Sequence, residues 1–299
     1  MKVSKNETMV DKILFVINPI SGNKPKEFIT ELIEEKFQED QYKATIIFTS
    51  FAGEATQIVK KYTKKDYKKV VAIGGDGTVN EVASAIVDTN AVLGIVPFGS
   101  GNGLARQLNI PLKADKALDI IKIGNKRKID YGKINDQNFF CTTGVGFDAH
   151  IGHVFDKMEG RGLKNYLKAT VSEFRRYTPE RYEISMNGIT IVRDAFLITF
   201  ANASQYGNNA HIAPQANVQD GKLEIAIMKS FPLIAAPVIG ARLFLKNMDK
   251  SVYLETYQSK NIIVKRKSPD VIHYDGEPGE MGKILNIRVI EDGLNVFIA

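Results

Sequence analysis

Two glycine-rich turns, each between an apolar strand-like run and a helix-like run, constrain the fold of this chain more than any other feature. The first covers residues 73–81 and reads IGGDGTVNE, and the second covers residues 97–106 and reads PFGSGNGLAR. Apolar residues precede each turn and recur at helical spacing after it. A repeated strand, tight turn and helix predict an α/β unit with a parallel sheet, in which both turns lie at the carboxyl ends of their strands.

The backbone chemistry of such turns favours the binding of an anion. Glycine lets the main chain approach a ligand closely, and the first amides of a helix lack intrahelical partners and carry positive partial charge. A phosphate group fits there. Neither turn has the spacing of a dinucleotide-binding fingerprint or the Gly-Lys-Ser/Thr of an ATPase P-loop. The structural alternative is a pair of tight turns capped by Thr78 and Asn102, but two turns of this polar content favour phosphate binding.

The pattern along the chain changes near Tyr131. Before it, strand-like and helix-like periods alternate, which is typical of a parallel sheet covered by helices. After it, Asn187-Gly188 is a two-residue hairpin signal, and Asp220-Gly221 and Asp292-Gly293 are further turn signals between β-rich runs. The second half is therefore expected to be mainly antiparallel β structure.

These changes predict two domains. The first comprises residues 1–131, joined by the last strand at about residues 290–299, and the second comprises residues 132–289. Residues 162–177 carry an apolar stripe at helical spacing, which we expect to pack on a core rather than to touch a membrane.

Composition and charge limit the functional classes. The single cysteine, Cys141, excludes an internal disulfide framework and indicates a reducing compartment, so we expect a cytoplasmic protein. The longest apolar stretch, residues 231–245, contains two prolines and an arginine and is shorter than the roughly 20 residues that span a bilayer. The net charge of +6 suits nucleic acid, an anionic membrane surface or phosphorylated small molecules. Nucleic acid is not expected, because no nucleic-acid-binding motif accompanies the lysines.

The motifs together resemble the diacylglycerol kinase catalytic-domain family, which includes soluble bacterial lipid kinases and the sphingosine and ceramide kinases. The first turn alone is also found in NAD kinases and phosphofructokinase-like folds, but the full set is far more specific. The resemblance implies a Rossmann-like α/β domain followed by a β-sandwich that binds lipid. The matching segments are residues 18–22 (NPISG), both glycine-rich turns, residues 144–148 (GVGFD), residues 212–214 with Asp220-Gly221, and residues 275–277 (DGE).

The resemblance implies that ATP lies across the edge of the parallel sheet. Backbone amides of the two turns would hold its phosphates, the hydroxyl groups of Thr49 and Ser100 would donate hydrogen bonds, and Asp76 would orient the nucleotide or its magnesium ion. The expected ATP-binding residues are Asn18, Pro19, Ile20, Ser21, Gly22, Thr49, Gly75, Asp76, Gly77, Thr78, Val79, Asn80, Glu81, Ser100, Gly101 and Asn102.

Phosphoryl transfer to an alcohol also needs an acceptor for the hydroxyl proton. By the resemblance, Asp275 or Glu277 is this general base, and the choice between them stays open. A structural Mg²⁺ is implied at Asp220, with carbonyls of Asn217 and Lys222, and is linked through water towards Asp148, the third expected catalytic residue. The four histidines make no zinc pattern with the lone cysteine.

The sequence thus predicts an ATP- and Mg²⁺-dependent lipid kinase of phospholipid metabolism, which phosphorylates diacylglycerol or a sphingoid base. We expect reversible contact with an anionic membrane through basic residues near 122–128 or 161–176. The alternatives are an NAD kinase and a non-catalytic, nucleotide-binding regulator. Ser100, Gly103 and residues 205–209 depart from the common bacterial pattern, which leaves the lipid acceptor open. A homodimer stays one of the alternatives for its assembly.

Overall fold

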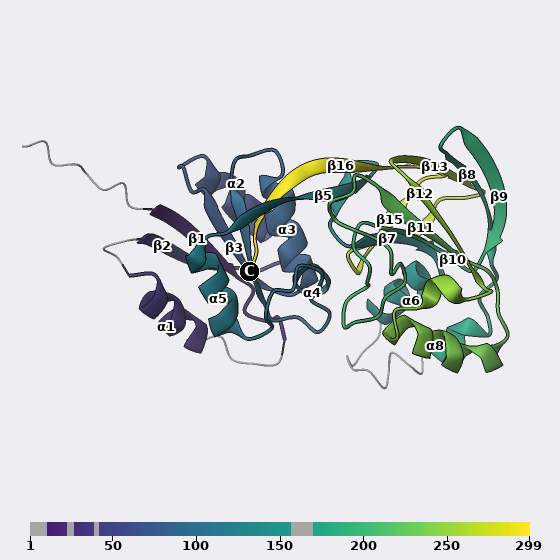
Figure 1. Cartoon of the computed structure of the whole chain (residues 1–299), viewed down its shortest axis with the longest axis horizontal. Coiled ribbons are helices and arrows are strands. Elements are labelled where there is room, and N and C mark those ends of the chain that lie inside the picture. The colour runs from purple at the N-terminus through teal and green to yellow at the C-terminus, as the bar shows by residue number, and fades with distance from the viewer. Residues whose placement is uncertain (1–10, 23–26, 39–41, 157–169) are drawn as a thin grey trace, which may run out of the picture. The chain divides into compact units, whose positions relative to one another are not determined.

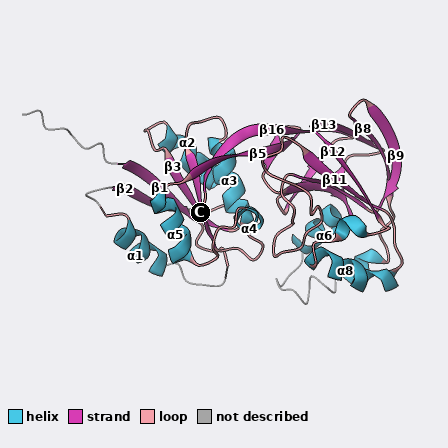
Figure 2. Ribbon diagram, in the orientation of Figure 1, coloured by secondary structure: helices cyan, strands magenta, loops and turns pink. Residues whose placement is uncertain are grey.

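The structure is a computed structural model that describes residues 11–22, 27–38, 42–156 and 170–299. The chain divides into two compact units (Figures 1 and 2). Unit 1 comprises Met1–Gly99, Asn109–Arg127 and Asn295–Ala299, and unit 2 comprises Ser100–Leu108 and Lys128–Leu294. The second glycine-rich turn is thus shared between the units, since residues 100–108 pack with unit 2.

Unit 1 has a parallel sheet in the spatial order β2-β1-β3-β4. Its central strands are buried on both faces, which explains their uninterrupted valine and isoleucine runs. Helix α1 packs beside α5, and α2 packs beside α3 (Figure 1). The elements are β1 (Asp11–Ile17), α1 (Glu27–Lys36), β2 (Tyr42–Phe48), α2 (Glu54–Thr63), β3 (Lys69–Gly74), α3 (Asp76–Ile86), β4 (Val92–Pro97) and α5 (Ala114–Ile123).

The end of the chain belongs to unit 1. Residues Asn295 and Val296, at the end of β16 (Ile284–Phe297), pair in parallel with Val92 and Leu93 of β4. The predicted parallel α/β fold of the N-terminal part is confirmed.

Unit 2 is mainly antiparallel. One sheet has the spatial order β12-β11-β10-β7-β14-β15. A second antiparallel set has the spatial order β16-β13-β8-β9. Large apolar side chains of both sets, such as Tyr182, Phe200 and Leu285, share one core. The strands are β5 (Lys126–Ile134), β6 (Gln137–Phe139), β7 (Thr142–Gly146), β8 (Glu180–Met186), β9 (Ile189–Ala195), β10 (Leu197–Ala201), β11 (Leu223–Met228), β12 (Leu254–Ser259), β13 (Asn261–Arg266), β14 (Asp270–Tyr274) and β15 (Glu277–Met281).

Two of the predicted turns have different outcomes. Asn187 and Gly188 have φ values of 50° and 76° and join β8 to β9 as the predicted hairpin. Asp292-Gly293 is not a turn between strands, because β16 continues through it. The reason is tertiary contact with β5: Asp292 donates its N–H to Asp130, and a Cβ on Gly293 would lie 2.3 Å from the Tyr131 ring.

The helical segments of unit 2 cover a second apolar cluster that includes Phe147, Phe196 and Ile239. Most of the predicted helix at residues 162–177 lies outside the described residues; Phe174, at its described end, packs against Phe147 and Phe196. In the part of the chain that the structure describes, the helices are too short or too polar to cross a membrane. The segments are α4 (Gly103–Gln107), α6 (Phe147–Asp156), η1 (Leu233–Ala235), α8 (Ala236–Phe244) and η2 (Met248–Lys250).

Candidate functional site

The first glycine-rich turn connects β3 to the N-terminus of α3. A Cβ on Gly74 would lie 2.4 Å from the Thr78 hydroxyl oxygen, and one on Gly75 would lie 3.3 Å from the Cα of Gly99. A side chain at position 74 would therefore displace Thr78, and one at position 75 would be in tight contact with the backbone at Gly99. The first hydrogen bond within this part of the helix runs from the Val79 amide to the Gly75 carbonyl, at 3.0 Å. The amides before Val79 form the positive end of α3, where an anion is favoured.

The loop after β1 lies against this turn. The Asn18 backbone amide donates to the Ile73 carbonyl at 3.0 Å, and its side-chain amide donates to the Thr78 hydroxyl at 3.2 Å. Gly22 has φ +64°, and a Cβ there would lie 2.2 Å from the Phe98 carbonyl oxygen. Thr49 follows β2 and donates its backbone N–H to the Ile17 carbonyl at 2.8 Å. Within unit 1 the structure thus gathers residues 18–22, Thr49 and the start of α3 at the carboxyl ends of the parallel strands.

Three expected ATP-binding residues of α3 have contacts within unit 1. The Glu81 carboxylate accepts hydrogen bonds from the amides of Gly53 at 2.8 Å and Ala55 at 3.1 Å, so it caps the N-terminus of α2. Val79 is buried in the core, and the side-chain oxygen of Asn80 accepts a hydrogen bond from Ser84. Direct contact of these three with a nucleotide stays a prediction.

The second turn is held within unit 2 from Ser100 onward. Asn102 has φ 51° and is buried. The Gly101 carbonyl accepts hydrogen bonds from the Asn208 amide at 2.9 Å and the Arg106 side chain at 3.0 Å. A Cβ on Gly207 would lie 2.8 Å from the Cα of Gly101. The loop at residues 205–209 therefore fixes the backbone of the turn, and Ser100 stays exposed.

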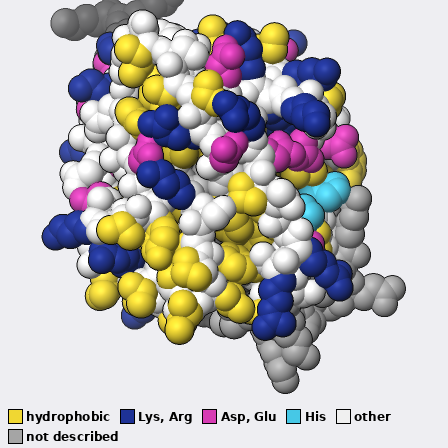
Figure 3. Space-filling view, turned by 90° about the vertical axis from the view of Figure 1, so that its right-hand side faces the viewer, with side chains coloured by type: hydrophobic (Ala, Val, Ile, Leu, Met, Phe, Trp, Pro, Cys, Tyr) yellow, Lys and Arg dark blue, Asp and Glu magenta, His cyan; other side chains and the backbone are white. Residues whose placement is uncertain are grey.

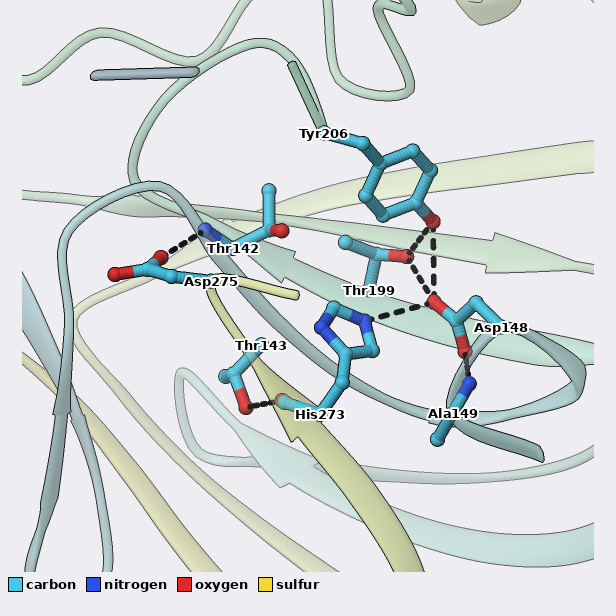
Figure 4. Close-up of polar contacts among 8 residues, drawn as sticks. All are labelled: Thr142, Thr143, Asp148, Ala149, Thr199, Tyr206, His273 and Asp275. Carbon is cyan, nitrogen blue, oxygen red and sulfur yellow. Dashed lines mark hydrogen bonds and ion pairs between the residues drawn. The ribbon is translucent and has the colours of Figure 1, made fainter. Parts of the chain in front are cut away.

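Asp148, at the start of α6, is the centre of a polar cluster (Figure 4). One carboxylate oxygen, Oδ2, lies 3.1 Å from Nε2 of His273, 3.1 Å from the Tyr206 hydroxyl and 3.2 Å from the Thr199 hydroxyl. The two hydroxyl groups are 2.6 Å apart. The other oxygen accepts the amide of Ala149 at 2.8 Å. Because a carboxylate only accepts, the arrangement favours the His273 tautomer that carries its proton on Nε2.

The glycines before Asp148 are explained by this cluster. A Cβ on Gly144 would lie 2.8 Å from Nε2 of His273 and 2.9 Å from Oδ2 of Asp148. Gly146 has φ +100°, and a Cβ there would lie 2.7 Å from the Phe196 carbonyl oxygen. The Gly-Val-Gly-Phe-Asp motif therefore brings the strand backbone close enough for the carboxylate and the imidazole to meet.

Asp275 lies in the tight connection between β14 and β15, with φ 50°. Its carboxylate accepts hydrogen bonds from three successive backbone amides, those of Phe140 at 2.8 Å, Cys141 at 2.7 Å and Thr142 at 3.1 Å. Glu277 begins β15 and is exposed. The structure thus holds one candidate base rigidly and leaves the other accessible to solvent.

The loop at residues 217–222, the expected cation site, is fixed by a buried carboxylate. Asp130 is 2% exposed and accepts the amides of Gly221 and Asp292, each at 2.8 Å. Asp220 is exposed and accepts the Lys222 amide at 3.0 Å. Oxygen ligands of this kind suit a hard cation such as Mg²⁺. The described residues contain no group of three or more acidic, histidine or cysteine side chains that could hold a metal. The expected site, one carboxylate with the carbonyls of Asn217 and Lys222, stays a prediction.

The sequence did not point to the partners of these carboxylates. No motif contains Thr199 or Asp130, Tyr206 falls only within the divergent loop at residues 205–209, and the sequence indicates for His273 no more than the lack of a zinc pattern. One signal was available, since His273 lies two residues before Asp275 in a strand that leads into the Asp-Gly-Glu segment. The contacts of Thr199, Tyr206 and Gly221 join residues that are 51, 58 and 91 positions apart, and the contact between Asp130 and Asp292 joins residues that are 162 positions apart, so no local pattern indicates them.

A parallel α/β unit with a glycine-rich, anion-favouring turn, followed by an antiparallel β unit with fixed carboxylates, is an architecture that suits the binding of a phosphate-bearing ligand. Comparison with known families agrees with this interpretation. Residues 12–134 match the diacylglycerol kinase catalytic domain, and residues 141–297 match the YegS C-terminal NAD kinase beta sandwich-like domain. The chain belongs to this diacylglycerol kinase and YegS family of lipid kinases.

The similarity to curated relatives and to solved structures extends over most of the chain. It is 27% identical over 285 residues to "Diacylglycerol kinase" of Bacillus subtilis (strain 168), covering 91% of this chain and 92% of that one. It is 31% identical over 232 residues to "Probable lipid kinase YegS" of Salmonella paratyphi A, covering 75% and 76%. A crystal structure of a diacylglycerol kinase from Bacillus anthracis str. Sterne shares the fold, with a TM-score of 0.76, 20% identity and 98% of each chain covered.

Proposed function

We propose that this protein transfers the γ-phosphoryl group of ATP to a hydroxyl group of a membrane lipid, either diacylglycerol or a sphingoid base, in the cytoplasm. The kinase class follows from the family. The observation that carries the proposal is the arrangement at the carboxyl ends of the strands in unit 1, where residues 18–22 and Thr49 lie beside the glycine-lined N-terminus of α3. Triphosphate oxygens are the ligands that such an arrangement favours.

The catalytic requirements of phosphoryl transfer are positioning and neutralisation of charge. In the proposal, the amides at the start of α3 and Ser100 to Asn102 hold the phosphate oxygens, and Asp76 orients the nucleotide. Magnesium bound with the nucleotide would supply positive charge to the phosphates. A second, structural ion would be held by Asp220 and the carbonyls of Asn217 and Lys222, where it would stabilise the loop.

The hydroxyl group of the lipid must lose its proton during the transfer. We assign this proton to Asp275 or Glu277. The carboxylate of Asp275 accepts hydrogen bonds from three backbone amides, which hold it in a fixed orientation. Glu277 is exposed and reaches solvent without rearrangement. Asp148, held by His273 and two hydroxyl groups, is assigned an orienting role towards the acceptor.

The experiment incubates purified protein with labelled ATP, Mg²⁺ and a panel of diacylglycerol, sphingosine and NAD. The proposal expects labelled lipid and no labelled NAD. Labelled NAD alone would indicate an NAD kinase, and ATP binding without transfer would indicate a regulator. Asp275→Asn and Glu277→Gln are tested separately, with Glu280→Gln as the matched control, because Glu280 is exposed on the same strand β15. The loss of a general base lowers the rate by roughly 10²–10⁴. Wild-type turnover by both folded variants would refute the assignment.

A further inference from the structure

The segment formed by η1, α8 and the residues up to Val252 carries apolar side chains that face solvent. Ile234 is 87% exposed, Leu245 is 69% exposed and Phe244 is 61% exposed. Leu233, Val238 and Val252 are exposed as well. Figure 3 shows hydrophobic side chains gathered over the lower part of this face of unit 2, where α8 lies in Figure 1, with lysine and arginine side chains around them.

The arrangement is a property of the helix, not a scatter of single residues. Exposed residues of α8 and its end recur at spacings of three and four, which places them on one side of the helix. They are Pro237, Val238, Ala241, Phe244 and Leu245, and all are apolar.

The opposite side of α8 is apolar too. Ile239 is buried and Leu243 packs against the core cluster of unit 2. Apart from Arg242, which donates a hydrogen bond to the Asn247 carbonyl, α8 has apolar side chains on both sides, and its exposed side therefore favours a second apolar environment in addition to the core. With nine residues, α8 cannot span a bilayer, but it can lie in the interface of one.

The charges around the apolar face favour an anionic lipid surface over a protein core. Two of the four cations between residues 229 and 253 have partners within the protein, since Lys229 is ion-paired with Glu255 and Arg242 donates to the Asn247 carbonyl. The other two cations are Lys246 and Lys250, and the one anion in this stretch is Asp249. Lys246 and Lys250 are exposed, whereas Asp249 is half-buried. Exposed apolar side chains flanked by lysine and arginine are typical of helices that lie in the interface plane of an anionic membrane.

We propose that the face formed by Leu233, Ile234, Val238, Phe244, Leu245 and Val252 is the membrane-docking surface of this protein. It inserts into the headgroup region of an anionic bilayer, and Lys246 and Lys250 contact the lipid phosphates. The inference rests on the proposed lipid kinase function for its biological purpose, but it is physically independent of it. It differs from the basic segments at residues 122–128 and 161–176 in that apolar burial, not charge alone, holds the protein on the membrane.

The chain contains no tryptophan, so a single tryptophan placed in the face reports its environment without background. Phe244→Trp is mixed with vesicles of phosphatidylcholine and phosphatidylglycerol in the absence of ATP. We expect a blue-shifted emission and quenching by brominated phosphatidylcholine. The matched control is Ile189→Trp, because Ile189 is 52% exposed at the start of β9, away from α8 in Figure 1. Its emission should not change. If vesicles change the emission of Phe244→Trp no more than that of Ile189→Trp, the proposal is overturned.

A second measurement tests the contribution of the apolar groups to binding. The triple variant Val238→Ser, Phe244→Ser and Leu245→Ser should bind the vesicles at least about tenfold more weakly than the wild type. Added salt should weaken wild-type binding without abolishing it. Because these side chains are exposed, circular dichroism should show an unchanged fold. Wild-type binding by the triple variant would overturn the proposal.

The remaining outcomes separate docking from catalysis. Vesicle binding by the wild type without phosphorylation of any lipid supports docking and contradicts only the kinase proposal. Phosphorylation of a short-chain, water-soluble diacylglycerol with no vesicle binding contradicts only docking. If the wild type is a dimer in sedimentation experiments, fails to bind vesicles and becomes monomeric in the triple variant, the face is an interface between two copies of this chain and docking is refuted.

Discussion

Replacing the buried carboxyl group of Glu224 by an amide should stabilise the protein above neutral pH and have little effect in mild acid. Glu224 lies in β11 and is 3% exposed. Its Oε2 atom has no hydrogen-bond partner among the described residues. Burial, together with the negative charge of Asp249, raises the pKa of this carboxyl group from 4.5 to about 7. The folded state therefore disfavours the ionised form that the unfolded chain adopts.

The magnitude follows from the two pKa values. Between pH 4.5 and about 7 the folded protein keeps a proton on Glu224 that the unfolded chain has released. The free energy of unfolding consequently falls as the pH rises through this window and stays low above it. The pKa difference of 7 − 4.5 corresponds to about 3 kcal/mol, at 1.36 kcal/mol for each pH unit. Glutamine has no proton to lose, so Glu224→Gln should recover this amount.

Urea unfolding of the wild type and Glu224→Gln at about pH 5 and about pH 8 measures the effect. The two proteins should be nearly equally stable at the lower pH, and the variant should be more stable at the higher pH. Carbon NMR of the Glu224 carboxyl group gives its pKa directly. Glu280→Gln, which changes an exposed carboxyl group, should show no such difference. A normal pKa for Glu224, or a variant no more stable than the wild type at the higher pH, would refute the reasoning.

Three further substitutions test the described contacts. Gly144→Ala should destabilise unit 2 by about 1–3 kcal/mol in urea unfolding, because the new Cβ would lie 2.8 Å from both the Ile198 carbonyl oxygen and the His273 ring. Glu255→Gln should cost about 1–2 kcal/mol near neutral pH, since the hydrogen bond from Lys229 lowers the pKa of Glu255 from 4.5 to about 2. The difference from the wild type should shrink as the pH falls below 4.5. Glu81→Ala should lower the unfolding free energy by about 1–2 kcal/mol through the loss of the α2 cap, and calorimetric ATP binding by the folded variant tests the separate prediction that this residue contacts the nucleotide.

The fold was predictable where burial leaves a local pattern. Strands β3 and β4 are buried on both faces, so their apolar runs followed by glycine-rich turns indicated a parallel sheet. The Asn187-Gly188 hairpin was predictable because its two positive φ values require such residues. Asp292-Gly293 has the same sequence signal and a positive φ at Asp292, yet tertiary contacts with Asp130 and Tyr131 keep it inside a strand.

The candidate site was predictable only in part, because motifs reveal which residues are special and not what they contact. The glycines at 144 and 146 marked a close approach of the backbone, but the approaching groups, His273 and the Phe196 carbonyl, are distant in the sequence. Glu81 was expected to contact ATP, and the structure shows it bonded to the start of α2. The expected roles of Asp275 and Glu277 rest on the resemblance, since a local analysis of this segment indicates a hairpin loop.

Asp130 and Asp275 have structural contacts, so a loss of activity on substitution of either carboxylate does not by itself separate a catalytic role from a structural one. Each of these side chains accepts backbone amides and fixes a loop: Asp130 holds the loop that carries Asp220, and Asp275 holds the connection that leads to Glu277. Asp275→Asn replaces one accepting oxygen by a donor that opposes a backbone N–H, at a cost of about 1–3 kcal/mol. A slower enzyme therefore follows whether Asp275 takes the proton or only positions Glu277. Glu277→Gln leaves these amide contacts intact, so full activity in that variant, combined with loss in Asp275→Asn at unchanged substrate KM, would assign the proton to Asp275.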